Sequence, residues 1–177
     1  MSKTIKIGEI MLTEAQISKR VKELADMINK DYENKEVIVI GILKGCFVFV
    51  SDLVRKLTCD PSVYFMEVSS YCDRTVSSGK VCIKKDLDID IKGKDIIIAE
   101  DIIDSGNTLS QLTKILEERE PASIKVCALL SKPSRRQVEF EADYTGFVIE
   151  DRFIIGYGLD CAEKFRQLPY IAEVEIQ

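Results

Sequence analysis

The sequence contains no histidine among its 177 residues. This absence excludes the usual Ser-His-Asp and Cys-His nucleophilic arrangements, and every metal site that depends on imidazole ligands. Proton transfer must therefore use Asp, Glu, Lys, Tyr or Cys side chains. A bound metal is expected to be a hard cation held by oxygen atoms, such as Mg²⁺.

Long apolar segments and basic stretches are also missing. No run approaches the roughly 18 apolar residues of a membrane span, and residues 1–9 are too short and polar for a signal peptide. We therefore expect a cytoplasmic protein with no membrane partner. The net charge is −5 and no basic stripe dominates, so nucleic-acid binding is not expected, although this charge is compatible with a local basic pocket.

Cysteine occurs six times, but never in the CxxC spacing of a zinc or redox motif. A chain of this length buries a core large enough to fold without covalent links, so we expect neither a disulfide framework nor a zinc site. The expectation is a single domain, residues 1–177, with buried or half-buried thiols in a reducing compartment.

Apolar runs at 37–43, 96–100 and 124–130 are continuous rather than alternating, which is typical of strands covered on both faces. Helical spacing separates these runs, and a capping box at 13–16 opens a further helix that is expected to end near Tyr32. Strands that alternate with helices predict an α/β fold of three layers, with a mainly parallel central sheet flanked by helices.

The most informative stretch runs from Ile96 to Leu109 and has the sequence IIIAEDIIDSGNTL. A buried strand is expected to end at the adjacent acids Glu100 and Asp101, and a loop of small polar residues then leads into a helix that is expected to end at Glu120. The backbone N–H groups that open such a helix favour an anion. Carboxylates beside an anion site indicate that a cation or a polyhydroxyl ligand binds there as well.

Two lysines follow other predicted strands: Lys44 comes after 37–43 and Lys132 comes after 124–130. Parallel strands bring their carboxyl ends to one edge of the sheet, where the ligands of open α/β sheets bind. For Lys44, a functional role and plain solvation in a loop are evenly balanced interpretations. The polar connection from about 71 to 92 predicts either a lid over the site or a plain β-ribbon.

The Walker motif G-x-x-x-x-G-K-[ST] and the dinucleotide fingerprint G-x-G-x-x-G are both absent. The order of apolar strand, two acids and Asp-Ser-Gly-Asn-Thr instead resembles the signature of the type I phosphoribosyltransferases. Further matching segments extend over nearly the whole chain, at 43–45, 69–71, 132–136, 156–160 and 165–166. Their combination is most similar to the bacterial hypoxanthine (hypoxanthine–guanine) members of that family.

The resemblance implies transfer of a 5-phosphoribosyl group from phosphoribosyl pyrophosphate (PRPP) to hypoxanthine or guanine in purine salvage, giving IMP or GMP and pyrophosphate. It implies Mg²⁺ as the cofactor, held by Glu100, Asp101 and Asp160. Asp104 matches the catalytic base that accepts the purine N7 proton. The residues that match the PRPP and phosphate site are Lys44, Gly45, Glu100, Asp101, Asp104, Ser105, Gly106, Asn107, Thr108 and Arg166.

The resemblance also assigns a purine pocket and a covering loop. Lys132 matches the lysine that contacts the purine 6-oxo group, and Phe153 matches the aromatic side chain that stacks on the base, with the Ile154 backbone and Asp160 at the edge of the purine ring. Ser70 and Tyr71 match a mobile loop at about residues 70–92. A small hood is expected from about residues 1–12 and 150–177, and a homodimer or homotetramer is the expected assembly.

Three details of the family pattern matter for this chain. The family often has a non-proline cis peptide in the loop that contains Lys44. Asn107 stands where some relatives have lysine, which removes one possible phosphate-binding charge, and Cys161 stands where tyrosine is usual. The alternative function on this fold is a non-catalytic regulator that senses PRPP and binds RNA or DNA. The acidic net charge and the presence of Asp104, Lys132 and Phe153 favour the enzyme.

Overall fold

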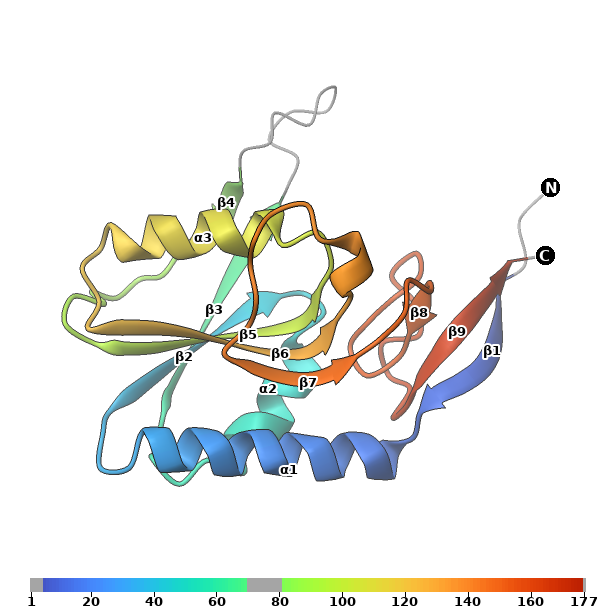
Figure 1. Cartoon of the computed structure of the whole chain (residues 1–177), viewed down its shortest axis with the longest axis horizontal. Coiled ribbons are helices and arrows are strands. Elements are labelled where there is room, and N and C mark those ends of the chain that lie inside the picture. The colour runs from blue at the N-terminus through green and yellow to red at the C-terminus, as the bar shows by residue number, and fades with distance from the viewer. Residues whose placement is uncertain (1–4, 70–80, 177) are drawn as a thin grey trace.

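A computed structural model of the chain describes residues 5–69 and 81–176 (Figure 1). Ser70 and Tyr71, which were predicted to lie on a mobile loop, fall outside these ranges. Within the described ranges, no helix is long and apolar enough to cross a membrane.

The central element is a six-stranded sheet with the strand order β4-β3-β2-β5-β6-β7. Every neighbouring pair in this sheet is parallel except β3–β4. The prediction of a mainly parallel sheet is therefore confirmed. Its strands are β2 (Val37–Leu43), β3 (Ser62–Ser69), β4 (Cys82–Lys85), β5 (Asp95–Ile103), β6 (Ser123–Ser131) and β7 (Tyr144–Val148).

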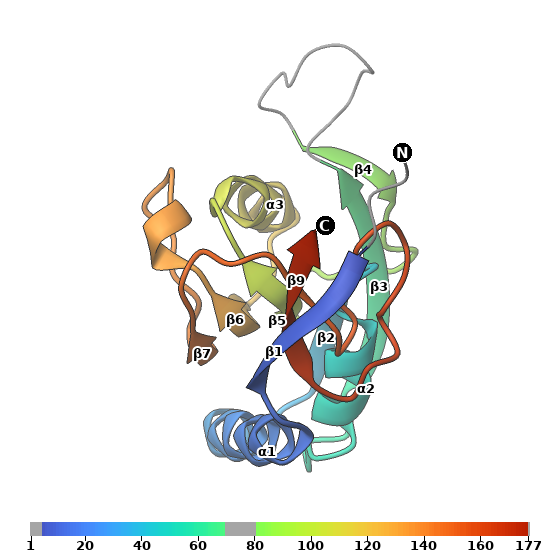
Figure 2. The ribbon, with the colours of Figure 1, turned by 90° about the vertical axis from the view of Figure 1, so that its right-hand side faces the viewer.

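Helices cover both faces of the sheet and produce the three layers seen end-on in Figure 2. α1 (Glu14–Asp31) and α2 (Phe47–Val54) lie on one face, and α3 (Asn107–Glu117) lies on the other. Along β2, Val39 packs with the α1–α2 layer, whereas Ile40 packs with the α3 layer. The run 37–43 is apolar throughout because both faces of this strand are buried.

The predicted capping box opens α1. Thr13 Oγ1 accepts a hydrogen bond from the Gln16 backbone N–H (3.3 Å), and the Gln16 side chain accepts one from the Thr13 N–H (2.9 Å). The helix ends just before Tyr32, as expected. Its apolar face anchors it to the sheet through the buried side chains of Ile17, Val21, Leu24, Ala25 and Ile28.

A second, antiparallel sheet has the strand order β1-β9-β8. It consists of β1 (Ile5–Leu12), β8 (Ile154–Ile155) and β9 (Ile171–Ile176), so segments from the two ends of the chain pair with each other. Figure 1 shows this sheet beyond the carboxyl ends of the parallel strands. The terminal segments thus form the expected hood, although no strand was predicted for β1.

Two elements end at positions that differ from the sequence-based expectation. β5 was expected to end at the two acids, but it continues to Ile103 because Glu100 and Ile102 still pair with β6. α3 was expected to reach Glu120, but it ends at Glu117. Glu120 has a positive φ of 55°, which is incompatible with a continuing helix.

The described part of the connection between β3 and β5 contains β4, which pairs antiparallel with β3. The Ile91 side chain farther along this connection is buried. Residues 82–85 therefore form a ribbon with β3, and a lid function of this region stays a prediction.

The described cysteines are of two kinds. Cys46, Cys59, Cys127 and Cys161 are free thiols, as expected, but Cys82 is disulfide-bonded. The expectation of reduced thiols throughout the chain is therefore wrong at Cys82.

Candidate active site

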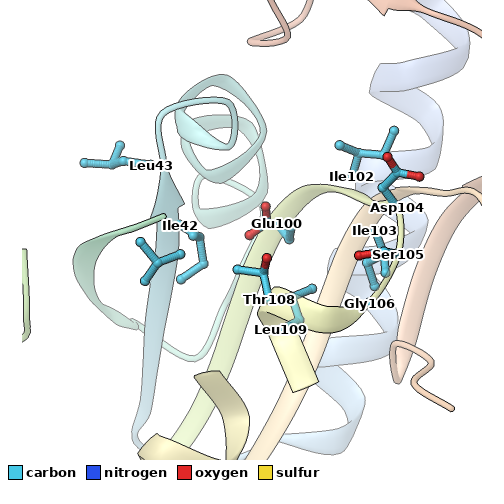
Figure 3. A pocket seen from close by; sticks show the side chains of 11 residues that line it. Ile42, Leu43, Glu100, Ile102, Ile103, Asp104, Ser105, Gly106, Thr108 and Leu109 are labelled. Carbon is cyan, nitrogen blue, oxygen red and sulfur yellow. The ribbon is translucent and has the colours of Figure 1, made fainter. Parts of the chain in front are cut away.

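The carboxyl ends of β2, β5 and β6 meet at the edge of the sheet that faces the hood (Figure 1). Two cavities open there, one of about 220 Å³ (Figure 3) and one of about 370 Å³. Ile102 and Asp104 line both of them. All the described residues that were predicted for the site line one cavity or the other, except Asn107. The fold thus brings together residues from widely separated segments.

The loop between β5 and α3 lines the smaller cavity together with residues of β2, β3 and β5 (Figure 3). Gly106 precedes the first turn of α3 with φ = 81°, a conformation that glycine adopts without strain. The Ser105 Oγ accepts a hydrogen bond from the Asn107 backbone N–H (3.3 Å). The Asn107 side-chain amide donates to Oε1 of Gln137 (2.7 Å). The amide groups at a helix N-terminus carry partial positive charge, so this cavity, with Ser105 and Thr108 on its wall, suits an anionic ligand.

Glu100 and Asp101 are consecutive residues near the carboxyl end of β5. Glu100 lines the smaller cavity and Asp101 lines the larger one. Burial, followed by the neighbouring Asp101 carboxylate, raises the pKa of Glu100 well above its usual value. Burial also raises the pKa of Asp101, although the hydrogen bonds that its carboxylate makes, including one from the Ile102 N–H (2.8 Å), oppose this shift.

The Oε2 atom of Glu100 is buried and has no hydrogen-bond partner in the part of the chain that the structure describes. A buried acceptor without a donor destabilises the fold, so a cation or a hydroxyl ligand fits beside it. Among the described residues, no group of three or more His, Cys, Asp or Glu could hold a metal by itself. These carboxylates therefore suit a Mg²⁺ ion that takes its other ligands from a substrate and from water.

The loop after β2 packs directly against Asp101. Its Leu43–Lys44 peptide bond is cis. A Cβ atom at Gly45 would lie 1.5 Å from Oδ2 of Asp101, so only glycine fits at this position. On the other side, a Cβ atom at Gly158 (φ = 99°) would lie 2.1 Å from the Gly45 carbonyl oxygen. The Gly45 backbone is therefore held between an acid of β5 and the hood.

Ion pairs link Asp104 with Lys132 through two further residues. Arg135, at the end of the short 3₁₀ helix η1 (Pro133–Arg135), donates from Nε to Oδ1 of Asp104 (3.0 Å) and from Nη1 to Oδ2 of Asp151 (3.2 Å). Lys132 Nζ lies 3.5 Å from Oδ1 of Asp151 and donates to the Arg152 carbonyl oxygen (2.7 Å). Because Lys132 is buried, a carbonyl group that enters the larger cavity meets a donor with a fixed position.

The hood forms the remaining wall of the larger cavity. Phe153 exposes 56% of its surface there, although its ring is large and apolar. The adjacent Ile154 is buried and belongs to β8, which pairs with β9. Asp160 lines the same cavity. An exposed aromatic ring beside an ammonium donor and a carboxylate suits a planar, polar ring as ligand.

Two residues of this region were not predicted from the sequence. The first is Arg136, whose guanidinium is nearly buried. It donates to the Ile103 carbonyl oxygen (3.0 Å) and to the Ser131 Oγ (2.7 Å), and it also donates to the Asp104 carbonyl oxygen. It ties the loop after β5 to the end of β6. The segment 132–136 was noted as a matching motif, but a sequence does not show which carbonyl groups an arginine will contact.

The second is Glu163, in the hood loop, where Lys44 and Arg166 meet. Lys44 Nζ lies 3.2 Å from both carboxylate oxygens of Glu163, and Arg166 Nη2 lies 3.3 Å from Oε2. Hydrogen bonds from Lys44 and then Arg166 lower the pKa of Glu163, so this carboxylate is ionised at neutral pH. No motif in the sequence pointed to Glu163.

This fold and site define a class of protein, and the comparison with known proteins agrees. The chain belongs to the phosphoribosyltransferase family, since residues 9–162 match the phosphoribosyl transferase domain. It is 46% identical over 168 residues to the hypoxanthine phosphoribosyltransferase of Escherichia coli (strain K12), covering 94% of each chain. It is 47% identical over 165 residues to the hypoxanthine-guanine phosphoribosyltransferase of Bacillus subtilis (strain 168), covering 93% of this chain and 92% of that protein.

A solved structure shows the same relationship in three dimensions. The crystal structure of a hypoxanthine-guanine phosphoribosyltransferase from Bacillus anthracis superposes with a TM-score of 0.91 at 46% sequence identity. The match covers 97% of this chain and 100% of that chain. The family and the fold predicted from the sequence are therefore confirmed.

Proposed function

We propose that this protein transfers the 5-phosphoribosyl group of PRPP to hypoxanthine or guanine in purine salvage, giving IMP or GMP and pyrophosphate. The observation that carries this proposal is that Asp104 lines both cavities, between an anion-binding loop and a pocket with Lys132 and Phe153. A general base at this position would lie beside the five-membered ring of the purine, which carries both N7 and the N9 atom that bonds to ribose. Similarity to hypoxanthine and hypoxanthine-guanine phosphoribosyltransferases supports the choice of a 6-oxopurine.

The smaller cavity would hold the ribose 5-phosphate of PRPP. Backbone N–H groups of the loop 104–108 and the hydroxyl groups of Ser105 and Thr108 would bind its oxygen atoms. Glu100 and Asp101 would bind the ribose 2′- and 3′-hydroxyl groups, directly or through Mg²⁺. The orphaned Glu100 Oε2 supports this assignment, because a ligand hydroxyl or a cation would satisfy it.

The larger cavity would hold the purine. Phe153 would stack on the face of the purine, and Lys132 would donate a hydrogen bond to its 6-oxo oxygen. The Ile154 backbone and Asp160 would contact the opposite edge of the purine ring. Adenine presents an amino donor at the 6-position, which an ammonium group cannot pair with, so the pocket would reject it. Asp104 would accept the N7 proton as the N9–ribose bond forms.

The leaving pyrophosphate would bind to Lys44 and Arg166, which line the same cavity. One Mg²⁺ beside Glu100 and Asp101 and a second beside Asp160, each taking its other ligands from PRPP and water, would neutralise part of the pyrophosphate charge. Glu100 and Asp101 would ionise when Mg²⁺ binds beside them, and their carboxylates would then also favour the positive charge that develops on the ribose ring during transfer.

Formation of IMP from hypoxanthine, PRPP and Mg²⁺ by the purified protein tests the proposal. Guanine and xanthine serve as further acceptors, and adenine serves as the base that Lys132 should reject. We expect turnover with hypoxanthine or guanine and none with adenine. PRPP binding without turnover of any of these bases would contradict the proposal and favour a non-catalytic sensor of PRPP.

A further inference from the structure

Glu163 contacts both of the cations to which the proposed function assigns pyrophosphate. We propose that Glu163 is a competing anion built into the pyrophosphate site, and that PRPP or pyrophosphate must compete with it for Lys44 and Arg166. This inference rests on the proposed placement of pyrophosphate against these two cations. It predicts that the charge of Glu163 weakens the binding of pyrophosphate.

The backbone around Glu163 forms an ordered turn that brings its side chain close to the two cations. Ala162 and Glu163 both have positive φ, at 52° and 62°, and an antiparallel bridge between Cys161 and Lys164 closes the turn. The Glu163 N–H donates to Oδ2 of Asp160 (2.8 Å). Because the turn is already ordered, the ion pairs form without the entropic cost of ordering a flexible segment.

The two cations differ in how firmly they are held. Arg166 has anchors besides Glu163: its Nη1 donates to the Gly158 carbonyl oxygen (2.8 Å), and its Nη2 lies 2.8 Å from Oδ1 of Asp160. Lys44 exposes 58% of its side chain, and Glu163 is its only ion-pair partner among the described residues. Removal of the Glu163 charge should therefore free Lys44 and leave Arg166 in place.

The position of Glu163 allows competition without a steric block. Its side chain lies at a neighbouring cavity of about 640 Å³ and does not line the cavity that holds the predicted site residues. It therefore has open space to move into when a polyanion binds. The carboxylate still repels the pyrophosphate charge and still attracts Lys44, so it lowers the affinity for pyrophosphate. A lower affinity favours release of pyrophosphate after the transfer.

Calorimetric titration of the full chain with pyrophosphate and Mg²⁺ tests this inference. Glu163→Gln keeps the size of the side chain but removes its charge, and we expect pyrophosphate to bind about three- to tenfold more tightly at low salt. The difference should shrink as ionic strength rises, because both partners of the Lys44–Glu163 pair are exposed to solvent. Glu118→Gln removes the same charge from an exposed residue after α3 and should leave the affinity unchanged.

Equal or weaker binding by Glu163→Gln would overturn the inference, and weaker binding would mean that Glu163 orients the cations for the ligand. Lys44→Ala separates this result from the proposed function. If Lys44→Ala loses affinity while Glu163→Gln equals the wild type, only the role of Glu163 is refuted. If the wild type does not bind pyrophosphate, or if Lys44→Ala binds as the wild type does, the placement of pyrophosphate is refuted as well.

Discussion

Arg135 donates from Nε to Oδ1 of Asp104 across 3.0 Å, whereas no described residue forms a hydrogen bond with Oδ2 of Asp104. One oxygen atom of the proposed base is therefore held by a guanidinium, and the other is left for a ligand. Arg135 follows Lys132 in the same short segment, so a single loop fixes both the base and the donor proposed for the 6-oxo group.

Arg135→Ala should lower kcat about three- to tenfold, because the Asp104 carboxylate loses the partner that orients it. The KM for PRPP should change by less than about twofold, since the phosphate loop is untouched. Arg135→Lys should recover part of the activity by keeping the charge without the planar fork. Steady-state kinetics measure these effects, and thermal unfolding should be unaltered because the Asp104–Arg135 pair is half exposed. A wild-type kcat in Arg135→Ala would contradict the orienting role.

Asp104→Asn should lower kcat by about 10²- to 10⁴-fold, the usual loss when a general base is removed. The Kd for PRPP should stay close to the wild-type value, because phosphate binding uses the backbone of the loop and Arg136 still holds the carbonyl oxygen of residue 104. Single-turnover kinetics combined with a PRPP titration separate the two quantities. An unchanged kcat would exclude Asp104 as the base.

Gly45→Ala should abolish most activity and destabilise the protein. The added methyl group would lie 1.5 Å from Oδ2 and 2.6 Å from Cγ of Asp101, so the acid or the Lys44 loop must move. We expect kcat/KM to fall more than about tenfold, as for other displacements of binding groups. Gly93→Ala is the matched control, because its methyl group meets no atom within 4 Å although φ is 68°. It should lower the melting temperature slightly and leave kcat/KM unchanged; a similar loss in both variants would refute the specific role of Gly45.

Glu100→Gln should stabilise the protein at about pH 7 to 8 when neither PRPP nor Mg²⁺ is present. Burial raises the folded-state pKa of Glu100, so the wild type loses stability as pH rises from the unfolded-state pKa toward the folded-state pKa. Glutamine mimics the protonated acid and does not have this loss. The difference in unfolding free energy should therefore vanish near about pH 4 and grow by about 1.4 kcal/mol per pH unit while only the folded state holds the proton.

Urea unfolding at a series of pH values measures this difference for Glu100→Gln. Glu118→Gln, at an exposed position, should show little dependence of its unfolding free energy on pH relative to the wild type. A pH-independent offset between Glu100→Gln and the wild type would mean that the Glu100 pKa is not raised in the folded state.

Much of the fold and of the site could be predicted because the relevant signals are local. The capping box at Thr13, the buried strand at 37–43 and the small-residue loop at 104–108 each depend on neighbouring residues along the chain. Backbone sterics, hydrogen bonds over three or four residues and hydrophobic periodicity act at this range. The parallel sheet then places the ends of its strands at one edge, which explains why Lys44, Asp104 and Lys132 came together as expected.

Tertiary structure decided the features that depend on partners far along the chain. β5 extends past its acids because β6 continues to pair with it, and β1 is a strand because β9 pairs with it. Lys44 meets Glu163 across 119 positions, and Arg135 meets Asp104 across 31. The sequence by itself determined which chemical groups are present and which short segments carry them. Only folding decided which charges face one another, because the energy of an ion pair depends on distance in space and not on separation along the chain.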